Sequence, residues 1–303
     1  MPDAPLLSII VVTWNCRDLA LRCLDEIAAS RIGAPYEVLV VDNASADGTA
    51  AAVAAAHPAV RLTVNAENLG YARANNQAIA EAAGAFLLLL NPDAFPTGAD
   101  EFAAMLSFLR AHGEYAALGC QLVHPDGRHQ VGDAGFRPTP RHVAAHGLGL
   151  TRLMPGARGL FVTRLPDAVM DVDWVCGACL LVRAEVVRQV GGLDDRFFLY
   201  AEDVEWGCRM RARGHRIGYL PGVRMLHIQG GTQAGASPRW LDSLGQLYAR
   251  MNGGRRWGVF RWSLAAGFAM RAAAYRAASL LPGRDSLAAR GRVMGLYARH
   301  VWA

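Results

Sequence analysis

Hydrophobic and polar residues alternate along the first 123 residues in blocks that are typical of an α/β protein. Short apolar runs predict buried strands at 6–12, 36–41, 60–64, 86–90 and 116–123. Helical spacing or capping residues predict helices at 17–29, from Ser45 and Asp47 to 56, at 72–83 and at 99–112. Alternating strands and helices predict an α/β fold with a Rossmann-like, mostly parallel central sheet flanked by helices.

The pattern loosens after residue 123. Residues 124–168 are rich in Gly, Pro, His and Arg, which favours a lid or a binding loop. Beyond them we expect strands at 171–182, 216–220 and 223–228, helices at 184–190 and 202–213, and helices throughout 240–303, with breaks at Gly253-Gly254 and Pro282-Gly283. The expected domains are therefore 1–236, with halves 1–123 and 124–236, and a helical extension, 237–303.

Charge is distributed unevenly along the chain. All 31 basic residues are Arg, so a P-loop lysine, a Schiff-base lysine and a pyridoxal-phosphate anchor are excluded. Residues 239–303 hold 11 Arg against Asp242 and Asp285, so the net charge of +5 belongs to this tail. A basic tail of this kind can meet an anionic partner.

Within the tail, residues 257–281 combine aromatic residues, Leu and Ala with Arg261, Arg271 and Arg276. This pattern predicts a basic amphipathic helix on an anionic membrane surface. The same helix could equally pack on the first domain or build a homodimer, and we expect no nucleic-acid partner. The six cysteines do not form a disulfide framework, which favours a reducing, cytoplasmic compartment. The Cys176–Cys179 pair has no second C-x-x-C partner, so buried structural cysteines are favoured over a redox or zinc site.

Four successive predicted strands end in small polar or acidic residues, at the edge where open α/β sheets bind ligands. These residues are Thr13, Trp14 and Asn15; Asp42, Asn43, Ala44 and Ser45; Asn65, Glu67 and Asn68; and Asn91, Pro92 and Asp93. Any one of them could simply make a turn or cap a helix, but their coincidence predicts a site. A carboxylate after the second strand could accept from a base or a ribose, and one after the fourth could hold Mg²⁺ or Mn²⁺ on a diphosphate.

Several ordered segments resemble glycosyltransferase family 2 over roughly residues 6–232. They are LSIIVVTWN, YEVLVVDNASADGT, ENLGYARANNQAI, FLLLLNPDA, the stretch from WVCGACLLV to GCRMRARGHRI, and HIQGG. The pieces ENLGYARANN, NPDA and FFLYAEDVEWGCR look like the rhamnosyltransferase-like branch.

The resemblance implies a GT-A fold in which 1–123 bind a nucleotide-sugar and 124–236 bind the acceptor. The implied nucleotide-sugar residues are Thr13, Asn15, Asp42, Asn43, Asn68, Arg73, Asn91 and Asp93. Asn91-Pro92-Asp93 stands where many relatives have Asp-x-Asp, so one carboxylate of the motif is replaced by Asn. Asp93 is then the expected ligand of Mn²⁺ or Mg²⁺, and His227 is a second candidate with a structural role as its alternative.

The Glu202-Asp203 pair matches the family's Glu-Asp motif, whose second acid is the usual general base. A carboxylate is suited to this step because an acceptor hydroxyl must lose its proton as it attacks. The alternative is that both acids only favour the start of a helix. Gly177, Glu205 and Trp206 are the candidate acceptor contacts, although Trp206 could equally belong to the core.

The resulting hypothesis is a metal-dependent, inverting glycosyltransferase acting by direct displacement. It would move a sugar, with rhamnose from dTDP-rhamnose as one candidate, to a glycan or lipid-linked glycan. The expected location is the cytoplasm, peripheral on the inner face of the cell membrane. A UDP-hexose or UDP-galactofuranose donor stays open, and so does a non-catalytic, membrane-associated scaffold subunit.

Overall fold

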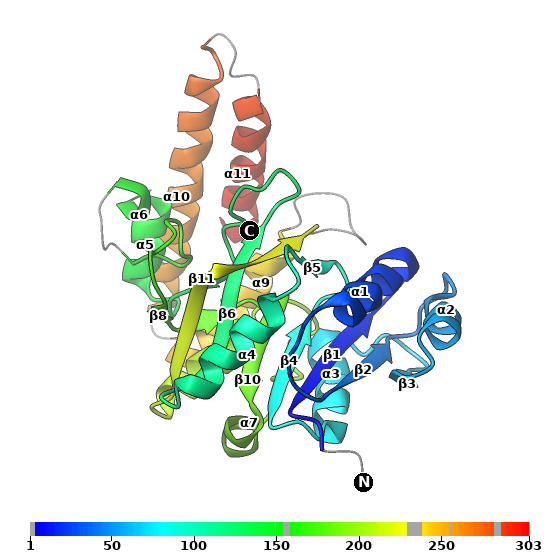
Figure 1. Ribbon diagram of the computed structural model, residues 1–303. Coiled ribbons are helices and arrows are strands. Elements are labelled where there is room, and N and C mark those ends of the chain that lie inside the picture. Colours follow the sequence, from blue (N-terminus) through cyan, green and yellow to red (C-terminus); the bar gives the residue numbers. More distant parts are fainter. Residues whose placement is uncertain are drawn as a thin grey trace. The chain divides into compact units, whose positions relative to one another are not determined.

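The protein is represented by a computed structural model that describes residues 4–148, 150–153, 158–228, 238–254, 256–281 and 286–302 (Figure 1). The chain forms two compact units. The first comprises Met1–Ala134 and Leu165–Ala234, and the second comprises Gly135–Arg164 and Gly235–Ala303. The segment 135–164, which we expected in the first domain, is thus part of the second unit, and the boundary expected at 236 lies outside the described residues.

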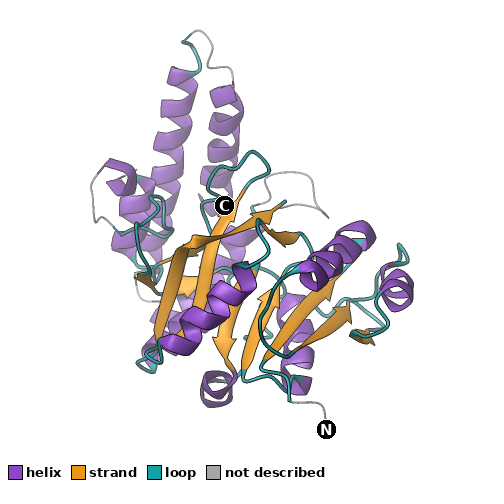
Figure 2. Cartoon of the chain, in the orientation of Figure 1, coloured by secondary structure: helices purple, strands orange, loops and turns teal. Residues whose placement is uncertain are grey.

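A nine-stranded sheet forms the centre of the first unit, with the strand order β3-β2-β1-β4-β10-β6-β11-β5 and β8 beside β11 (Figure 2). Its strands are β1 (Leu7–Thr13), β2 (Tyr36–Asp42), β3 (Arg61–Val64), β4 (Phe86–Leu90), β5 (Ala94–Pro96), β6 (Tyr115–Val123), β8 (Met170–Val172), β10 (Cys179–Arg183) and β11 (Arg216–His227). Two further strands have only two residues each, β7 (Ala134–Gly135) and β9 (Trp174–Val175). The described helices of this unit are α1 (Arg17–Ala29), α2 (Thr49–Ala56), α3 (Tyr71–Glu81), α4 (Glu101–Ala111), α7 (Ala184–Val190) and α8 (Glu202–Ala212).

Strands β3, β2, β1 and β4 run parallel to one another. Strands β1, β2 and β4 are mostly apolar because helices cover both faces of this part of the sheet, whereas the edge strand β3 is partly exposed. Ile9 and Val11 belong to a core that includes α1 and α4, whereas the intervening Ile10 packs with Ala74 and Ala78 of α3. The β1 side chains therefore alternate between the two layers of helices, as the two-residue period of a strand requires.

The predicted α/β class, with a central sheet flanked by helices and a helical C-terminal extension, is confirmed. The sheet is mixed beyond β4, because β10 runs antiparallel to both β4 and β6. The single strand expected at 171–182 is wrong in detail: a turn closed by a hydrogen bond from Cys179 N to Cys176 O separates β9 from β10. The two strands expected at 216–220 and 223–228 are one strand, β11, with a register shift between Leu220 and Arg224.

The second unit consists of α5 (Pro140–Gly147), α6 (Leu150–Leu153), α9 (Arg239–Asn252), α10 (Trp257–Ala278) and α11 (Ser286–Trp302). Helix α5 lies inside the stretch that we expected to be a loop, and it starts where Thr139 accepts a hydrogen bond from His142 N and Pro140 occupies the first turn. Gly147 of α5 and Gly267 of α10 approach closely, since a Cβ built on Gly267 would lie 2.5 Å from Gly147 Cα. The expected break at Gly253-Gly254 is present, with both glycines at positive φ, while Pro282-Gly283 lies outside the described residues.

None of the helices in the described ranges has the length and apolar character needed to cross a membrane.

Candidate functional site

The strand register brings Thr13, Asp42 and the Asn91–Asp93 loop to one edge of the sheet. Thr13 at the end of β1 pairs with Asp42 at the end of β2. On the other side of β1, Leu90 at the end of β4 pairs with Val11, so residues 91–93 follow beside the end of β1. Parallel neighbours that end together place their following loops together, as the sequence predicted.

Asp42 is buried and held in place by its neighbours. Its Oδ1 accepts from Thr13 Oγ1 at 2.9 Å and from Ser45 Oγ at 2.7 Å, and its Oδ2 accepts from Ser45 N at 2.9 Å. Asn15 has a left-handed φ of 47°, and its side-chain oxygen accepts from Ala46 N at 2.7 Å. Ser45 therefore orients the Asp42 carboxylate instead of capping α2, whose N-cap is Gly48.

Asn43 organises the loop that carries Asn68. Its Nδ2 donates to Asn68 Oδ1 at 2.9 Å and to Gly70 O at 3.2 Å, and its Oδ1 accepts from Leu69 N at 3.0 Å. Asn43 is 2% exposed and supports this loop, while its expected contact with a nucleotide-sugar stays a prediction. Arg73 is exposed, with Nε 3.5 Å from Asp195 Oδ2.

Asp93 and His227 meet because β5 and β11 pair. His227 is opposite Ala94, and Ile228 N donates to Asp93 O at 3.0 Å. As a result, His227 Nε2 lies 3.3 Å from Asp93 Oδ1. The other ring nitrogen, Nδ1, lies 2.6 Å from Gln130 Oε1.

These two side chains offer one carboxylate oxygen and one imidazole nitrogen, a donor set that suits Mn²⁺ or Mg²⁺ with oxygen ligands in the remaining positions. Within the described ranges, no group of three or more His, Cys, Asp or Glu side chains is arranged to hold a metal ion. Asp93 and His227 therefore fit a cation only if other ligands, such as diphosphate oxygens and water, complete its shell.

A buried thiol reports that Asp42 and Asp93 are near one another. Burial raises the pKa of Cys16 to about 11, and repulsion from Asp47, Asp93 and Asp42 adds to this effect. All three carboxylates therefore lie close enough to Cys16 for their charges to disfavour its thiolate. Cys16 itself is a neutral thiol there.

The Glu202-Asp203 pair opens α8 after an unusual stretch of backbone. Tyr200 and Ala201 both have a φ of 70°, a left-handed conformation that is costly for residues with a Cβ. Asp203 Oδ2 accepts from Gly177 N at 3.0 Å, and its Oδ1 accepts from Val204 N at 2.8 Å. The strained turn thus delivers Asp203 to the Cys176–Ala178 turn between β9 and β10.

That turn connects the two acidic loops. Asn91 N donates to Ala178 O at 3.0 Å, while the adjacent Gly177 N holds Asp203. Tyr71 OH donates to Gly177 O at 2.8 Å and fixes the same peptide from the side of α3. The loop of Asp93 and the carboxylate of Asp203 are therefore separated by a single short turn.

Burial distinguishes the two acids. Glu202 is 5% exposed, and its Oε2 finds no hydrogen-bond partner among the described residues. Burial, followed by the charge of Asp203, raises the pKa of Glu202 well above its usual range. Burial also raises the pKa of Asp203, although the hydrogen bond from Gly177 N opposes the shift.

Two expected acceptor residues lie elsewhere. Trp206 is completely buried, and its Nε1 donates to Gly191 O at 2.8 Å, so it is a core residue and not an acceptor contact. Glu205 is paired with Arg209, with 2.6 Å between Oε2 and Nη2. Since Arg209 also donates to Val190 O at 2.7 Å, this pair ties α8 to the end of α7.

The sequence of this chain matches family models and proteins that are already described. Residues 8–164 match the family model described as glycosyl transferase family 2, and residues 97–282 match the model of glycosyl transferase family group 2. The N-acetylglucosaminyl-diphospho-decaprenol L-rhamnosyltransferase of Mycobacterium tuberculosis is 32% identical over 241 residues, which cover 73% of this chain and 76% of the relative. The chain belongs to glycosyl transferase family 2.

Other relatives of this family 2 glycosyltransferase point the same way. The rhamnosyltransferase WbbL of Escherichia coli is 24% identical over 230 residues, covering 72% of this chain and 82% of WbbL. In structure, the chain resembles the mannosyltransferase PcManGT from Pyrobaculum calidifontis, solved with GDP-Man and Mn²⁺. The TM-score is 0.62 and the sequences are 22% identical, and the match covers 99% of this chain and 86% of the mannosyltransferase. The structural likeness establishes the GT-A fold, and the sequence relatives establish a rhamnosyltransferase-like enzyme.

Sequence reasoning missed two residues of this family 2 site. Tyr71 lies in the quoted segment ENLGYARANN, but nothing local shows that its hydroxyl reaches Gly177, 106 residues away. Gln130 lies in the irregular stretch 124–168, 97 residues from His227. Only the three-dimensional structure identifies either one.

Proposed function

We propose that this glycosyltransferase inverts the configuration of the sugar that it transfers, with Asp203 as the general base. The donor is a nucleotide-diphosphate sugar, and the acceptor is a hydroxyl of a glycan or a lipid-linked glycan. The observation that carries this proposal is the turn at 176–178, which binds Asp203 through Gly177 N and the Asp93 loop through Ala178 O. A base and a diphosphate site on neighbouring loops are what direct displacement requires.

On the donor side, Asp42 is the proposed reader of the nucleoside. Its carboxylate is oriented by Thr13 and Ser45 and keeps further lone pairs that can accept from a base N–H or a ribose hydroxyl. Asn15, Asn68 and Asn91 are proposed to line the same edge. Arg73 is exposed near this loop, and its guanidinium is proposed to meet the sugar or the diphosphate.

Asp93 and His227 are the proposed holders of Mn²⁺ or Mg²⁺. A bound divalent cation would offset the negative charge that grows on the leaving diphosphate. Support comes from the 3.3 Å separation of the two ligand atoms and from a structural neighbour described with Mn²⁺. Because Asn91 replaces a carboxylate of the motif, more of the metal's coordination shell would be supplied by oxygens of the nucleotide-sugar donor.

On the acceptor side, Asp203 takes the proton of the attacking hydroxyl. Glu202 is buried, whereas Asp203 is half-buried and accepts hydrogen bonds from Gly177 N and Val204 N. This difference supports a pair in which Glu202 keeps its proton while Asp203 is ionised and able to accept one. Gly177 is proposed to border the acceptor; because it has no side chain, its peptide can lie against Tyr71 OH while it holds this carboxylate. Exposed Phe198 and Tyr200 precede the pair and can offer apolar surface to a sugar ring.

The relatives suggest which substrates should be tried first. Because two of them are rhamnosyltransferases, we propose dTDP-rhamnose as the donor and a sugar on a diphosphate-linked lipid as the acceptor. UDP-hexose and UDP-galactofuranose belong in the same panel, since donor choice depends on a few pocket contacts. We also propose that 257–281 lie on an anionic membrane surface, with a homodimer through the same helix as the competing possibility.

The decisive experiment compares the wild-type enzyme with Asp203→Asn. The variant should lose transfer by roughly two to four orders of magnitude, the usual contribution of a general base, while it binds the nucleotide diphosphate and Mn²⁺ normally. Nuclear magnetic resonance of the product should show the opposite anomeric configuration to the donor. Wild-type turnover by Asp203→Asn, or retention of configuration, would refute the mechanism, and full activity in excess chelator would refute the role of the metal.

A further inference from the structure

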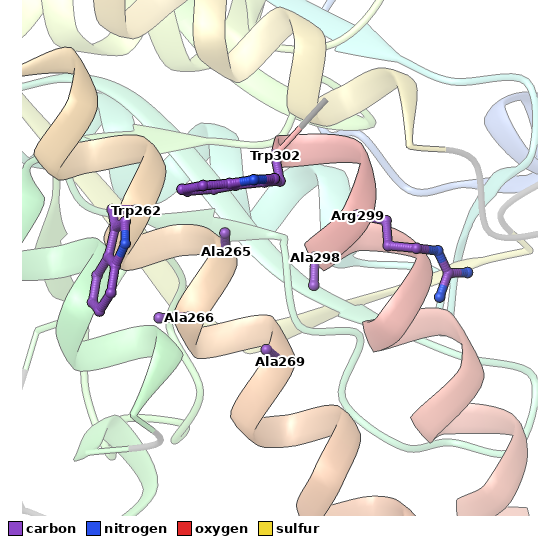
Figure 3. A pocket seen from close by; sticks show the side chains of 7 residues that line it. All are labelled: Trp262, Ala265, Ala266, Ala269, Ala298, Arg299 and Trp302. Atoms are coloured by element: carbon purple, nitrogen blue, oxygen red, sulfur yellow. The ribbon is translucent and has the colours of Figure 1, made fainter.

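An open groove lies between α10 and α11 of the second unit (Figure 3). Its volume is about 480 Å³, which is within the range of small-molecule sites. The lining residues are Trp262, Ala265, Ala266 and Ala269 from α10 and Ala298, Arg299 and Trp302 from α11. Because the floor is made of alanines, the two helices leave room for an apolar guest.

The groove is held open at one end by a capped helix terminus. Arg261 of α10 donates from Nε to Val301 O at 2.6 Å and from Nη2 to Trp302 O. These bonds satisfy the last carbonyls of α11 and fix its final turn beside α10. Figure 3 shows the Trp302 ring extending from α11 toward Trp262 on α10.

The rings at this end are unusually exposed. Trp262 and Trp302 are 63% and 62% exposed, although α10 already buries Phe260, Leu264 and Phe268 on its other side. Val259 and Met270 are further exposed apolar residues of α10. Several exposed apolar side chains on one helix, beside an apolar groove, indicate an interaction site.

Charge identifies the type of partner. Neither 257–281 nor 286–302 contains Asp or Glu. Arg292 and Arg299 are exposed on α11, and no acidic side chain within the described ranges forms an ion pair with either of them. An apolar groove beside cationic side chains is complementary to an anionic amphiphile.

A second copy of the chain fits this surface less well. A symmetric dimer would place the same face of both copies in contact, and two acid-free faces that carry arginines would repel one another. Exposed tryptophans beside arginines are instead typical of the boundary between lipid headgroups and acyl chains.

We propose that the α10–α11 groove binds one acyl chain of an anionic phospholipid, with Arg292 and Arg299 directed to its phosphate. This inference rests on the membrane association proposed above. It goes further because it assigns binding to a groove that accepts an acyl chain, rather than to general attraction between a basic helix and a charged membrane surface.

The test is sedimentation of the full chain with vesicles of phosphatidylcholine, alone or mixed with phosphatidylglycerol. Ala269→Phe places a ring in the groove and should weaken binding to the mixed vesicles by roughly tenfold or more. Ala274→Phe adds the same ring at an exposed position of α10 that does not line the groove, and it should bind at least as well as the wild type. General adsorption of a basic helix to the membrane predicts stronger vesicle binding by Ala269→Phe, because an added exposed ring strengthens such adsorption.

A second measurement observes the groove directly. Phosphatidylglycerol with brominated acyl chains should quench the fluorescence of Trp262 and Trp302, whereas inorganic phosphate should have no effect. The variants Trp262→Phe and Trp302→Phe identify the part of the emission that comes from these two residues. Equal vesicle binding by both Ala→Phe variants, or absence of quenching, would overturn the proposal. So would light scattering that shows a dimer broken by Ala269→Phe without any vesicle binding.

The controls separate this inference from the proposed catalytic function. Thermal unfolding and Mn²⁺-dependent binding of a nucleotide diphosphate by Ala269→Phe should match the wild type, which shows that the variant is folded. Failure of groove binding with normal transfer to a water-soluble acceptor overturns only the lipid site. Normal groove binding in a chain that transfers no sugar overturns only the proposed function.

Discussion

Gln130 determines which nitrogen of His227 faces Asp93. The backbone oxygen of His227 accepts from Gln130 Nε2 at 3.2 Å, so the amide of Gln130 must direct its oxygen at His227 Nδ1, which lies 2.6 Å away. An amide oxygen can only accept, and Nδ1 therefore carries the proton in the neutral ring. The lone pair of Nε2 is left toward Asp93 Oδ1, the orientation that a metal ligand needs.

Replacement of Gln130 should therefore weaken metal binding. We expect Gln130→Leu to lower the affinity for Mn²⁺ by roughly 10- to 100-fold, as removal of the partner of a ligating histidine does. Calorimetry or electron paramagnetic resonance with Mn²⁺ and a nucleotide diphosphate would measure this without relying on turnover. His124→Ala is the matched control, because His124 Nδ1 lies 3.1 Å from Gln130 Nε2, the amide nitrogen, and not beside the oxygen that faces His227. Unchanged Mn²⁺ affinity in Gln130→Leu would show that His227 is not a ligand.

The contrast between Asp42 and Gln130 shows what the sequence can and cannot reveal. The position of Asp42 followed from a local pattern, since an apolar run ends in an acid and parallel strands end at one edge. Gln130 has no such pattern around it, and its partner is 97 residues away. The strand β5, which brings Asp93 and His227 together, has only three residues and is equally invisible to periodicity.

Helix α8 provides a second lesson. Its sequence placed Glu202, Asp203, Glu205 and Trp206 within two turns, which made all four candidates for the site. The structure separates them: Asp203 meets Gly177, while Trp206 enters the core and Glu205 pairs with Arg209. A helix distributes successive side chains around its axis, so proximity in sequence overestimates the number that can share one cleft.

The pH dependence of transfer should report Asp203. Its pKa is raised by burial, so the carboxyl group stays protonated to a higher pH than that of an ordinary aspartic acid, whose pKa is about 3.9. A protonated Asp203 cannot accept the hydroxyl proton, and kcat/KM should fall about tenfold per pH unit below the shifted pKa. Measurement of kcat/KM from pH 4 to 9, with nucleotide affinity followed in parallel, would locate this limb. A rate that stays level down to pH 4 would contradict the assignment.

Tyr71 should act as a positioning residue for this base. Tyr71→Phe removes the hydroxyl that holds Gly177 O, which loosens the peptide whose N–H binds Asp203. We expect kcat to fall by about tenfold, a loss of about 1.4 kcal/mol of transition-state stabilisation. Because the bond from Gly177 N lowers the pKa of Asp203, its weakening should also move the acid limb of the rate profile upward.

A double-mutant cycle separates this role from general destabilisation. A Cβ at Gly177 would lie 2.9 Å from Tyr71 OH, so Gly177→Ala should disturb the same contact. Residues that act on one contact are not additive, and Tyr71→Phe with Gly177→Ala should cost less than the sum of the two changes. Tyr36→Phe, which alters a tyrosine that is 40% exposed, is the control for loss of a hydroxyl. Additive effects with an unmoved acid limb would leave Tyr71 with only a structural role.

Glu202 should make the protein less stable as the pH rises. Burial and the charge of Asp203 raise its pKa in the folded state, so the folded chain holds a proton that the unfolded chain releases at a lower pH. Between the unfolded pKa of about 4.3 and the raised folded pKa, the folded state binds more protons, and the free energy of unfolding falls as the pH increases. Glu202→Gln removes this dependence because the amide does not titrate. The variant should unfold at a higher temperature than the wild type at pH 8, by roughly 2–4 °C for each kcal/mol regained.

The same variant should show little advantage at pH 4, where the wild-type carboxyl group is protonated in the folded state and mostly protonated in the unfolded state, and so resembles the amide. Thermal unfolding of the wild type and of Glu202→Gln from pH 4 to 8 gives the difference in stability directly. Glu205→Gln is the matched control: because Glu205 is paired with Arg209, loss of its charge should destabilise the fold. A Glu202→Gln variant that is less stable than the wild type at pH 8 would mean that ionised Glu202 has a favourable partner. The unpaired Oε2 of Glu202 argues against such a partner, since a buried carboxylate oxygen without a hydrogen bond gains nothing that offsets its lost hydration.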